Sequence, residues 1–170
     1  PGSGKSTFVE KEAKELVNYH LVKTTFHQET TYYDFVGTYK PTTLYEKNDD
    51  IVNTAGEKFE LGKPVINYSF VIGHLIEAYL YAIENPNSNI VLVIDEINRG
   101  NVGVIFGDFF QLLDRDSKNG FKSEYEILPN ADLIEFLNSF DSMKGILADS
   151  KNHITLPGNL FIWGTMNSAD

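Results

Sequence analysis

The segment that most constrains this chain is its first seven residues, Pro1-Gly2-Ser3-Gly4-Lys5-Ser6-Thr7. Glycines at positions 2 and 4 let the backbone turn tightly, so that successive N–H groups point into one concave anion site. A helix that starts near Lys5 adds its positive dipole end. The pattern predicts a phosphate-binding loop, and the Gly-Lys-Ser order disfavours the alternative of a flexible Gly/Ser turn. The residues expected to contact a nucleotide are Gly2, Ser3, Gly4, Lys5, Ser6 and Thr7.

Two of these residues have more specific expected tasks. Lys5 can reach the β- and γ-phosphates of the nucleotide, and the Ser6 hydroxyl can bind Mg²⁺. Such a loop normally follows a buried strand, and its leading glycine stands five residues before Gly4, a position that would precede Pro1. We therefore expect the chain to be a piece of a longer protein, lacking the first strand of its sheet.

Apolar spacing predicts helices and strands in alternation along the 170 residues, which suffice for one domain. The expected helices cover residues 5–20, 68–84, 101–115 and 131–140. The expected strands cover residues 21–26, 90–94, 121–127 and 160–165. Residues 38–64 carry Gly, Pro, Asn and Asp with weak periodicity, which indicates a long loop or a hairpin. The alternation predicts a three-layer α/β fold with a parallel sheet.

The strand over residues 90–94 is an unbroken apolar run followed by Asp95 and Glu96. A strand of this kind is buried on both faces and delivers the two acids to the carboxyl edge of the sheet, where open α/β folds bind ligands. Alone, the pair could be an ordinary strand end. Downstream of a phosphate-binding loop, Asp95 is expected to hold Mg²⁺ or its water, and Glu96 to orient and deprotonate the attacking water.

The apolar strand over residues 160–165 ends in a polar side chain, Asn167. An amide at this edge could donate a hydrogen bond to the γ-phosphate or to the nucleophilic water. The alternative is an ordinary turn residue. Its location after a second buried strand favours the catalytic interpretation.

These three elements, in this order, resemble the Walker A, Walker B and sensor 1 motifs of AAA+ ATPases. Further segments are similar to the McrB-type branch, and the resemblance spans essentially the whole chain. The segments are Thr25-Phe26-His27-Gln28, Tyr33-Asp34-Phe35, Gly37-Thr38-Tyr39-Lys40-Pro41, Asp95-Glu96-Ile97-Asn98-Arg99 and Met166-Asn167-Ser168-Ala169-Asp170. Ser168 stands where the family more often has Thr.

The resemblance implies a P-loop NTPase core that runs from Walker A to sensor 1 over residues 1–170, without its first strand and lid. It also implies ATP or GTP as substrate with Mg²⁺ as cofactor, and a ring of subunits, normally a hexamer. An McrC-like nuclease would be the partner, and domains outside this chain would contact the DNA. Arg99 becomes a candidate for reaching a neighbouring subunit's phosphates, with a local salt bridge as the alternative; the usual arginine finger would follow Asp170.

Composition sets limits on these interpretations. Acidic residues outnumber basic ones 24 to 14, so this domain is not an obvious nucleic-acid binder. The chain has no cysteine and no apolar run long enough to span a membrane, which fits a cytoplasmic location. The 4 histidines show no metal-ligand spacing.

Two alternatives to the McrB-type interpretation stay open. One is a MoxR-like AAA+ ATPase that remodels proteins; the Phe26-His27-Gln28 and Asp95–Arg99 segments favour the McrB type over it. The other is a nucleotide-dependent assembly scaffold without turnover. The presence of Glu96 argues against that scaffold, since a protein that does not hydrolyse nucleotide has no need of a general base.

Overall fold

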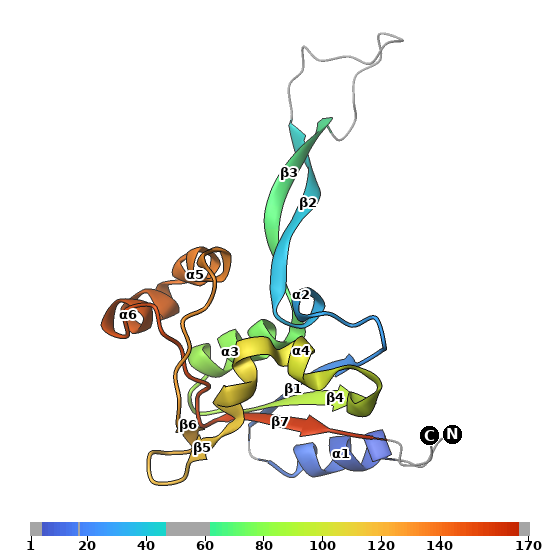
Figure 1. The fold of residues 1–170 in the computed structure, drawn as a ribbon, viewed down its shortest axis with the longest axis vertical. Helices are drawn as coiled ribbons and strands as arrows, with labels where there is room; N and C mark the ends of the chain where they lie inside the picture. Colours follow the sequence, from blue (N-terminus) through green and yellow to red (C-terminus); the bar gives the residue numbers. More distant parts are fainter. Residues whose placement is uncertain (1–4, 17, 47–61, 167–170) are drawn as a thin grey trace. The chain divides into compact units, whose positions relative to one another are not determined.

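A three-stranded parallel sheet forms the centre of the computed structural model, which describes residues 5–16, 18–46 and 62–166 (Figure 1). The strands are β1 (Tyr19–Thr25), β4 (Asn89–Asp95) and β7 (Leu160–Gly164), in the spatial order β1-β4-β7. Residues 90–94 of the middle strand are all buried, as the unbroken apolar run predicts. The register pairs Thr25 with Asp95 and Ile94 with Gly164, so the carboxyl ends of all three strands meet at one edge.

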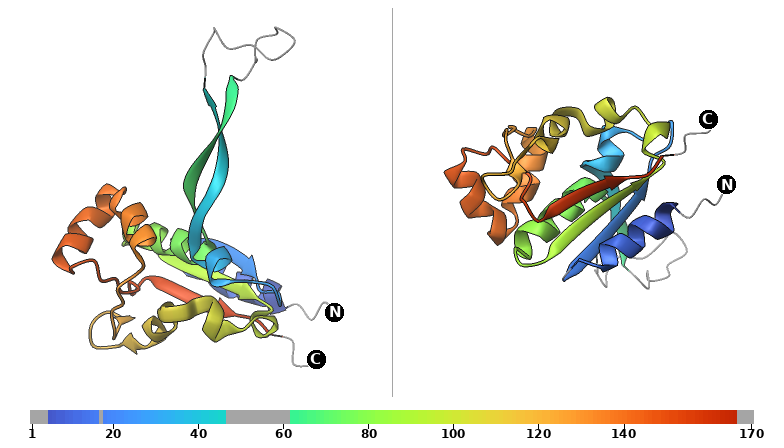
Figure 2. Two further views of the ribbon diagram at one scale, coloured as in Figure 1. Left: turned by 45° about the horizontal axis from the view of Figure 1, so that its top comes forward. Right: turned by 90° about the horizontal axis from the view of Figure 1, so that it is seen from below.

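Helices cover both faces of this sheet (Figures 1 and 2). Helix α1 (Lys5–Lys14) packs on one face, where Ala13 contacts the fully buried Val91 and Val93. Helix α3 (His74–Glu84) packs on the opposite face and buries most of its apolar stripe. The three-layer α/β architecture with a parallel sheet is therefore confirmed.

Two predicted helices are shorter in the structure than the apolar spacing suggested. Helix α1 ends at Lys14, and the remainder of the predicted segment 5–20 leads into β1. Helix α3 begins only at His74, because residues 68–72 belong to strand β3 (Lys63–Ile72). Gly73 separates strand from helix, and a Cβ there would come within 2.2 Å of the Phe35 carbonyl oxygen. The close backbone approach thus requires glycine at the boundary.

The segment after β4 is more broken than predicted. The 3-10 helix η1 (Ile97–Arg99) follows β4 directly. The helix expected over 101–115 splits into α4 (Val102–Phe106) and the 3-10 helix η2 (Gly107–Leu113). The split falls at Gly107, whose φ of 53° and ψ of −133° end the α-helical path.

The strand predicted over 121–127 is largely wrong. Only β6 (Lys122–Ser123) forms, antiparallel to β5 (Arg115–Asp116), and Ile127 makes an isolated bridge to Ile154. Helix α5 (Ala131–Asn138) confirms the next prediction, whereas α6 (Asp141–Asp149) and the short α2 (Tyr32–Phe35) were not predicted.

The chain divides into two compact units, one formed by Pro1–Thr38 with Ile72–Asp170 and the other by Tyr39–Val71. In the second unit β2 (Gly37–Glu46) pairs with β3, which makes the hairpin the correct one of the two alternatives for this region. Tyr39 and Phe70 pack edge to face with ring centroids 5.5 Å apart. The Thr42 and Ser69 hydroxyls hydrogen-bond at 3.0 Å.

One side-chain amide ties the end of α3 to the beginning of β7. Asn159 Nδ2 donates to the carbonyl oxygens of Ala82 at 3.1 Å, Asn85 at 3.1 Å and Ser88 at 2.9 Å. We expect Asn159→Ala to lower the free energy of unfolding by about 1–2 kcal/mol, because partly buried carbonyls lose their donor. Denaturant unfolding of the full-length protein measures the change. Asn119→Ala, in an exposed turn, is the control; equal stability of the two variants would contradict the assigned role.

Candidate functional site

The centre of the candidate site is a hydroxyl–carboxylate contact at the carboxyl edge of the sheet. Asp95 ends β4, and Thr165 follows β7 in the neighbouring position. The Thr165 hydroxyl donates to Asp95 Oδ1 at 2.8 Å and accepts from the Glu96 backbone N–H at 3.4 Å. The backbone continues the pairing, since Thr165 N–H donates to the Ile94 carbonyl and Ile97 N–H to the Thr165 carbonyl, both at 2.9 Å. The Asp95 carboxylate is thus held in a fixed orientation.

Glu96 occupies an unusual backbone conformation beside this contact. Its φ of 55° and ψ of 41° lie in the left-handed region, which a residue with a side chain rarely adopts. The conformation turns the chain sharply from the buried strand into η1. Strained backbone of this kind persists where the surrounding structure enforces it, and it clusters at functional sites.

The Glu96 carboxylate is engaged by a residue one turn further on. Arg99 Nε donates to Glu96 Oε2 at 3.0 Å, and the Arg99 and Glu96 side chains are 51% and 28% exposed. Of the two interpretations of Arg99 that the sequence allowed, the local salt bridge is therefore present in this chain. The contact to a neighbouring subunit stays a prediction.

The remaining predicted site residues are covered only in part. Helix α1 begins at Lys5, where the sequence pattern starts it. Figure 1 shows the first turn of α1 at the same end of the sheet as the arrowheads of β4 and β7. Gly2, Ser3, Gly4 and Asn167 lie outside the described residues, as do the side chains of Lys5, Ser6 and Thr7.

Thr165 is a site residue that the sequence interpretation missed. It was assigned only as the last residue of a predicted strand. A hydroxyl at the carboxyl end of a strand next to an acidic strand end was the available signal, but the bond depends on the register between β4 and β7.

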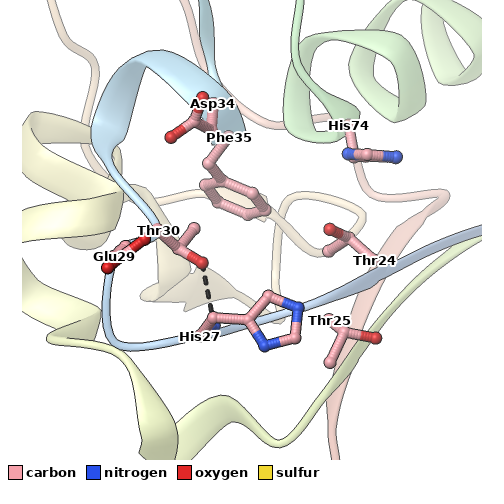
Figure 3. Close-up of a pocket in the computed structure, with 8 residues that line it drawn as sticks. All are labelled: Thr24, Thr25, His27, Glu29, Thr30, Asp34, Phe35 and His74. Carbon is pink, nitrogen blue, oxygen red and sulfur yellow. Dashed lines mark hydrogen bonds between the residues drawn. The ribbon is translucent and has the colours of Figure 1, made fainter.

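The loop between β1 and α2 forms a second polar region at this edge. His27 N–H donates to the Thr30 hydroxyl at 2.8 Å, and Thr31 and Asp34 cap α2 reciprocally. A pocket of about 400 Å³ opens beside the loop (Figure 3). Its lining residues are Thr24, Thr25, His27, Glu29, Thr30, Asp34, Phe35 and His74. The side chain of His27 is exposed and lines this pocket.

One residue at this edge, Asp95, could take part in holding a magnesium ion. Among the described residues, no three His, Cys, Asp or Glu side chains cluster around a metal position. Mg²⁺ commonly binds one or two carboxylates and completes its shell with water and phosphate oxygens. A single oriented carboxylate, Asp95, matches that requirement.

The chain has a parallel sheet with helices on both faces and acids at its carboxyl edge. A Gly-Ser-Gly-Lys-Ser segment precedes the sheet in the sequence. Together these features define an α/β fold of the P-loop NTPase kind. The chain belongs to the AAA domain family, dynein-related subfamily, whose model matches residues 1–144. Membership supports nucleotide binding and an NTPase role in general terms. In residues 5–16, 18–46 and 62–166, no helix is long and apolar enough to cross a membrane.

Two relatives are restriction proteins. Over 177 residues the chain is 39% identical to the component YdiS of the Type II restriction enzyme BsuMI from Bacillus subtilis (strain 168). Over 176 residues it is 24% identical to the EcoKMcrB subunit, a Type IV methyl-directed restriction enzyme subunit from Escherichia coli (strain K12). Each match covers all of this chain, but only 49% of YdiS and 29% of the EcoKMcrB subunit. The resemblance to McrB-type AAA proteins is thereby confirmed.

Proposed function

We propose that this chain binds a nucleoside triphosphate, ATP or GTP, with Mg²⁺ and hydrolyses its γ-phosphate. The observation that carries the proposal is the Asp95–Thr165 contact with Glu96 beside it, at the edge of the sheet where α1 also begins. Carboxylates held at the carboxyl ends of parallel strands, next to a helix N-terminus, suit a magnesium–phosphate centre.

In this proposal the first loop binds the phosphates. The backbone N–H groups from Gly2 to Thr7 surround the phosphate oxygens, and Lys5 neutralises charge on the β- and γ-phosphates. Ser6 and Asp95 would hold the metal. When bound, Mg²⁺ supplies electrostatic stabilisation of the phosphate oxygens.

The hydrolytic roles fall to two further residues. Glu96 orients the attacking water and accepts its proton, while Asn167 donates a hydrogen bond to that water or to the γ-phosphate. The left-handed backbone conformation of Glu96 supports this role, because strained conformations of this kind cluster at functional sites.

At the level of the whole protein, we propose a ring-forming motor of McrB type, normally hexameric, that drives a nuclease partner in DNA restriction in the cytoplasm. The restriction relatives support this assignment. The net charge of −10 supports DNA contacts through other domains. Arg99 would contact a neighbouring subunit's phosphates only after leaving Glu96.

Hydrolysis by the full-length protein tests the proposal. Turnover of Mg·GTP and Mg·ATP is compared with and without an McrC-like nuclease subunit. Turnover that the nuclease stimulates supports the restriction motor. Turnover that the nuclease does not change supports a MoxR-like ATPase that remodels proteins. Nucleotide binding without turnover supports an assembly scaffold.

The Thr165 hydroxyl should matter for turnover through Asp95. We expect Thr165→Val to lower nucleotide hydrolysis by about 10-fold or more, since outer partners that orient metal ligands typically contribute 10–100-fold. The magnesium dependence of the rate should shift to higher concentration. Thr165→Ser retains the hydroxyl and serves as the control. A valine variant that matches wild type would exclude the orienting role.

A further inference from the structure

The ion pair between Glu96 and Arg99 is held by the backbone as well as by its charges. Arg99 N–H donates to the Glu96 carbonyl oxygen at 2.9 Å, which closes the single turn of η1. The side chains then meet through Arg99 Nε and Glu96 Oε2 at 3.0 Å. The pair therefore forms within one short segment of this chain and needs no partner subunit.

The pair also has a defined side relative to the sheet. Ile97 lies toward β7, since its Cδ1 is 3.0 Å from the position that a Cβ on Gly164 would take. Asn98 and Arg99 lie toward β1 instead, where they line a polar cleft of about 490 Å³ with His27, Gln28 and Glu29. The Asp95 carboxylate, by contrast, is bound by Thr165 on the β7 side. Arg99, which pairs with Glu96, therefore lines a cleft on the β1 side of β4, whereas Thr165, which binds Asp95, lies on the β7 side.

We propose that Arg99 is a positioning residue that holds Glu96 in a resting orientation, away from the water that it would activate. The inference rests on the proposed hydrolytic function, because it concerns the same glutamate. It assigns Arg99 a role within its own chain, whereas the sequence alone suggested a role across a subunit interface. Glu96 reaches the water only in the fraction of molecules in which the pair is open.

The cleft offers a way to separate Arg99 from Glu96. It is open to solvent, and its described lining contains Arg99 together with the His27-Gln28-Glu29 segment. An anionic group that entered the cleft would compete with Glu96 for the guanidinium. Opening of the pair and engagement of Arg99 elsewhere would then be one event.

The test is steady-state hydrolysis by the full-length protein at concentrations where it is unassembled. Half-exposed ion pairs of this kind are closed by factors of about 1.5 to 5. Because only the open fraction reacts, Arg99→Ala should raise kcat by about 2.5- to 6-fold with KM unchanged. Arg99→Lys, which can still pair with Glu96, should give a smaller increase. A residue that acts across the interface, or one needed only for folding, would give an Arg99→Ala rate at or below wild type. That result would overturn the proposal.

A second readout needs neither nucleotide nor turnover. Unfolding of wild type, Glu96→Gln, Arg99→Ala and the double variant is compared without nucleotide in a double-mutant cycle. We expect the unfolding equilibrium constants to reveal a coupling of about 1.5- to 5-fold that shrinks in high salt. Absence of coupling would refute the proposal that Arg99 holds Glu96. Wild-type hydrolysis, measured in the same preparations, tests the proposed function separately.

Discussion

Glu96→Gln should reduce nucleotide hydrolysis by about 10²- to 10⁴-fold, the range that general acid–base catalysis supplies. The amide has nearly the shape of the carboxylate but cannot accept the proton of the attacking water. Phosphate binding by the first loop does not involve this side chain, so bound nucleotide should be trapped. Rates of phosphate release and the amount of retained nucleotide measure the two effects in the full-length protein.

The matched control is Glu135→Gln, which makes the same chemical change at an exposed position of α5. It should leave hydrolysis unchanged. A Glu96→Gln protein that turned over at the wild-type rate would show that the general base lies elsewhere. Loss of nucleotide binding in that variant would show that Glu96 contributes to the site in the ground state.

Replacing Arg115 by methionine should lower stability more than Asn159→Ala does. Its guanidinium donates to the carbonyl oxygens of Phe121 and Leu156, both at 3.3 Å, of Pro157 at 3.1 Å and of Leu160 at 3.0 Å. These bonds connect β5 to the loop before β6 and to the segment that enters β7. Burial lowers the pKa of the Arg115 guanidinium from its usual value, which still leaves it charged near neutral pH.

We expect Arg115→Met to lower the free energy of unfolding by about 2–3 kcal/mol, because partly buried carbonyls lose charge-assisted donors. Arg115→Lys should lose most of the same stability, since an ammonium lacks the planar fork that reaches several acceptors. Denaturant unfolding measures both changes. Lys118→Met, at an exposed position, is the control. An Arg115→Met variant as stable as this control would contradict a stabilising role of the Arg115 hydrogen bonds.

The sequence predicted the centre of the sheet well because its signals there are local. The run from Ile90 to Ile94 and the apolar strand before Asn167 are too long and too apolar for loops, and both are strands. The glycine-rich start predicted a helix from Lys5, and α1 begins there. These elements set the edge where Asp95, Glu96 and Thr165 lie.

The prediction failed where two periodicities overlapped. Val71, Ile72, Leu75 and Ile76 have helical spacing across a strand–helix boundary, so the interpretation extended the helix through Gly73. The close contact between Gly73 and the Phe35 carbonyl decides the boundary, and it joins residues far apart in the sequence. The prediction also failed over residues 107–128. Strands β5 and β6 are only two residues long each, too short to leave a periodic pattern in the sequence.

The site shows the same division between local and distant information. Asp95 and Glu96 follow from one strand, whereas the Thr165 hydroxyl reaches Asp95 only because β7 pairs with β4 in one register. The two interpretations of Arg99 could not be separated by sequence, because both need only a guanidinium near an acid. The backbone turn of η1 is what brings it to Glu96.

The most direct test of the central claim is a structure of the full-length protein with Mg²⁺ and a non-hydrolysable triphosphate analogue. The account predicts the β- and γ-phosphates at the start of α1, with Asp95 in the metal's coordination shell directly or through water. Glu96 should then point to the water facing the γ-phosphate, with its bond to Arg99 broken. Phosphates bound away from Asp95, for example in the pocket beside His27, would contradict the account.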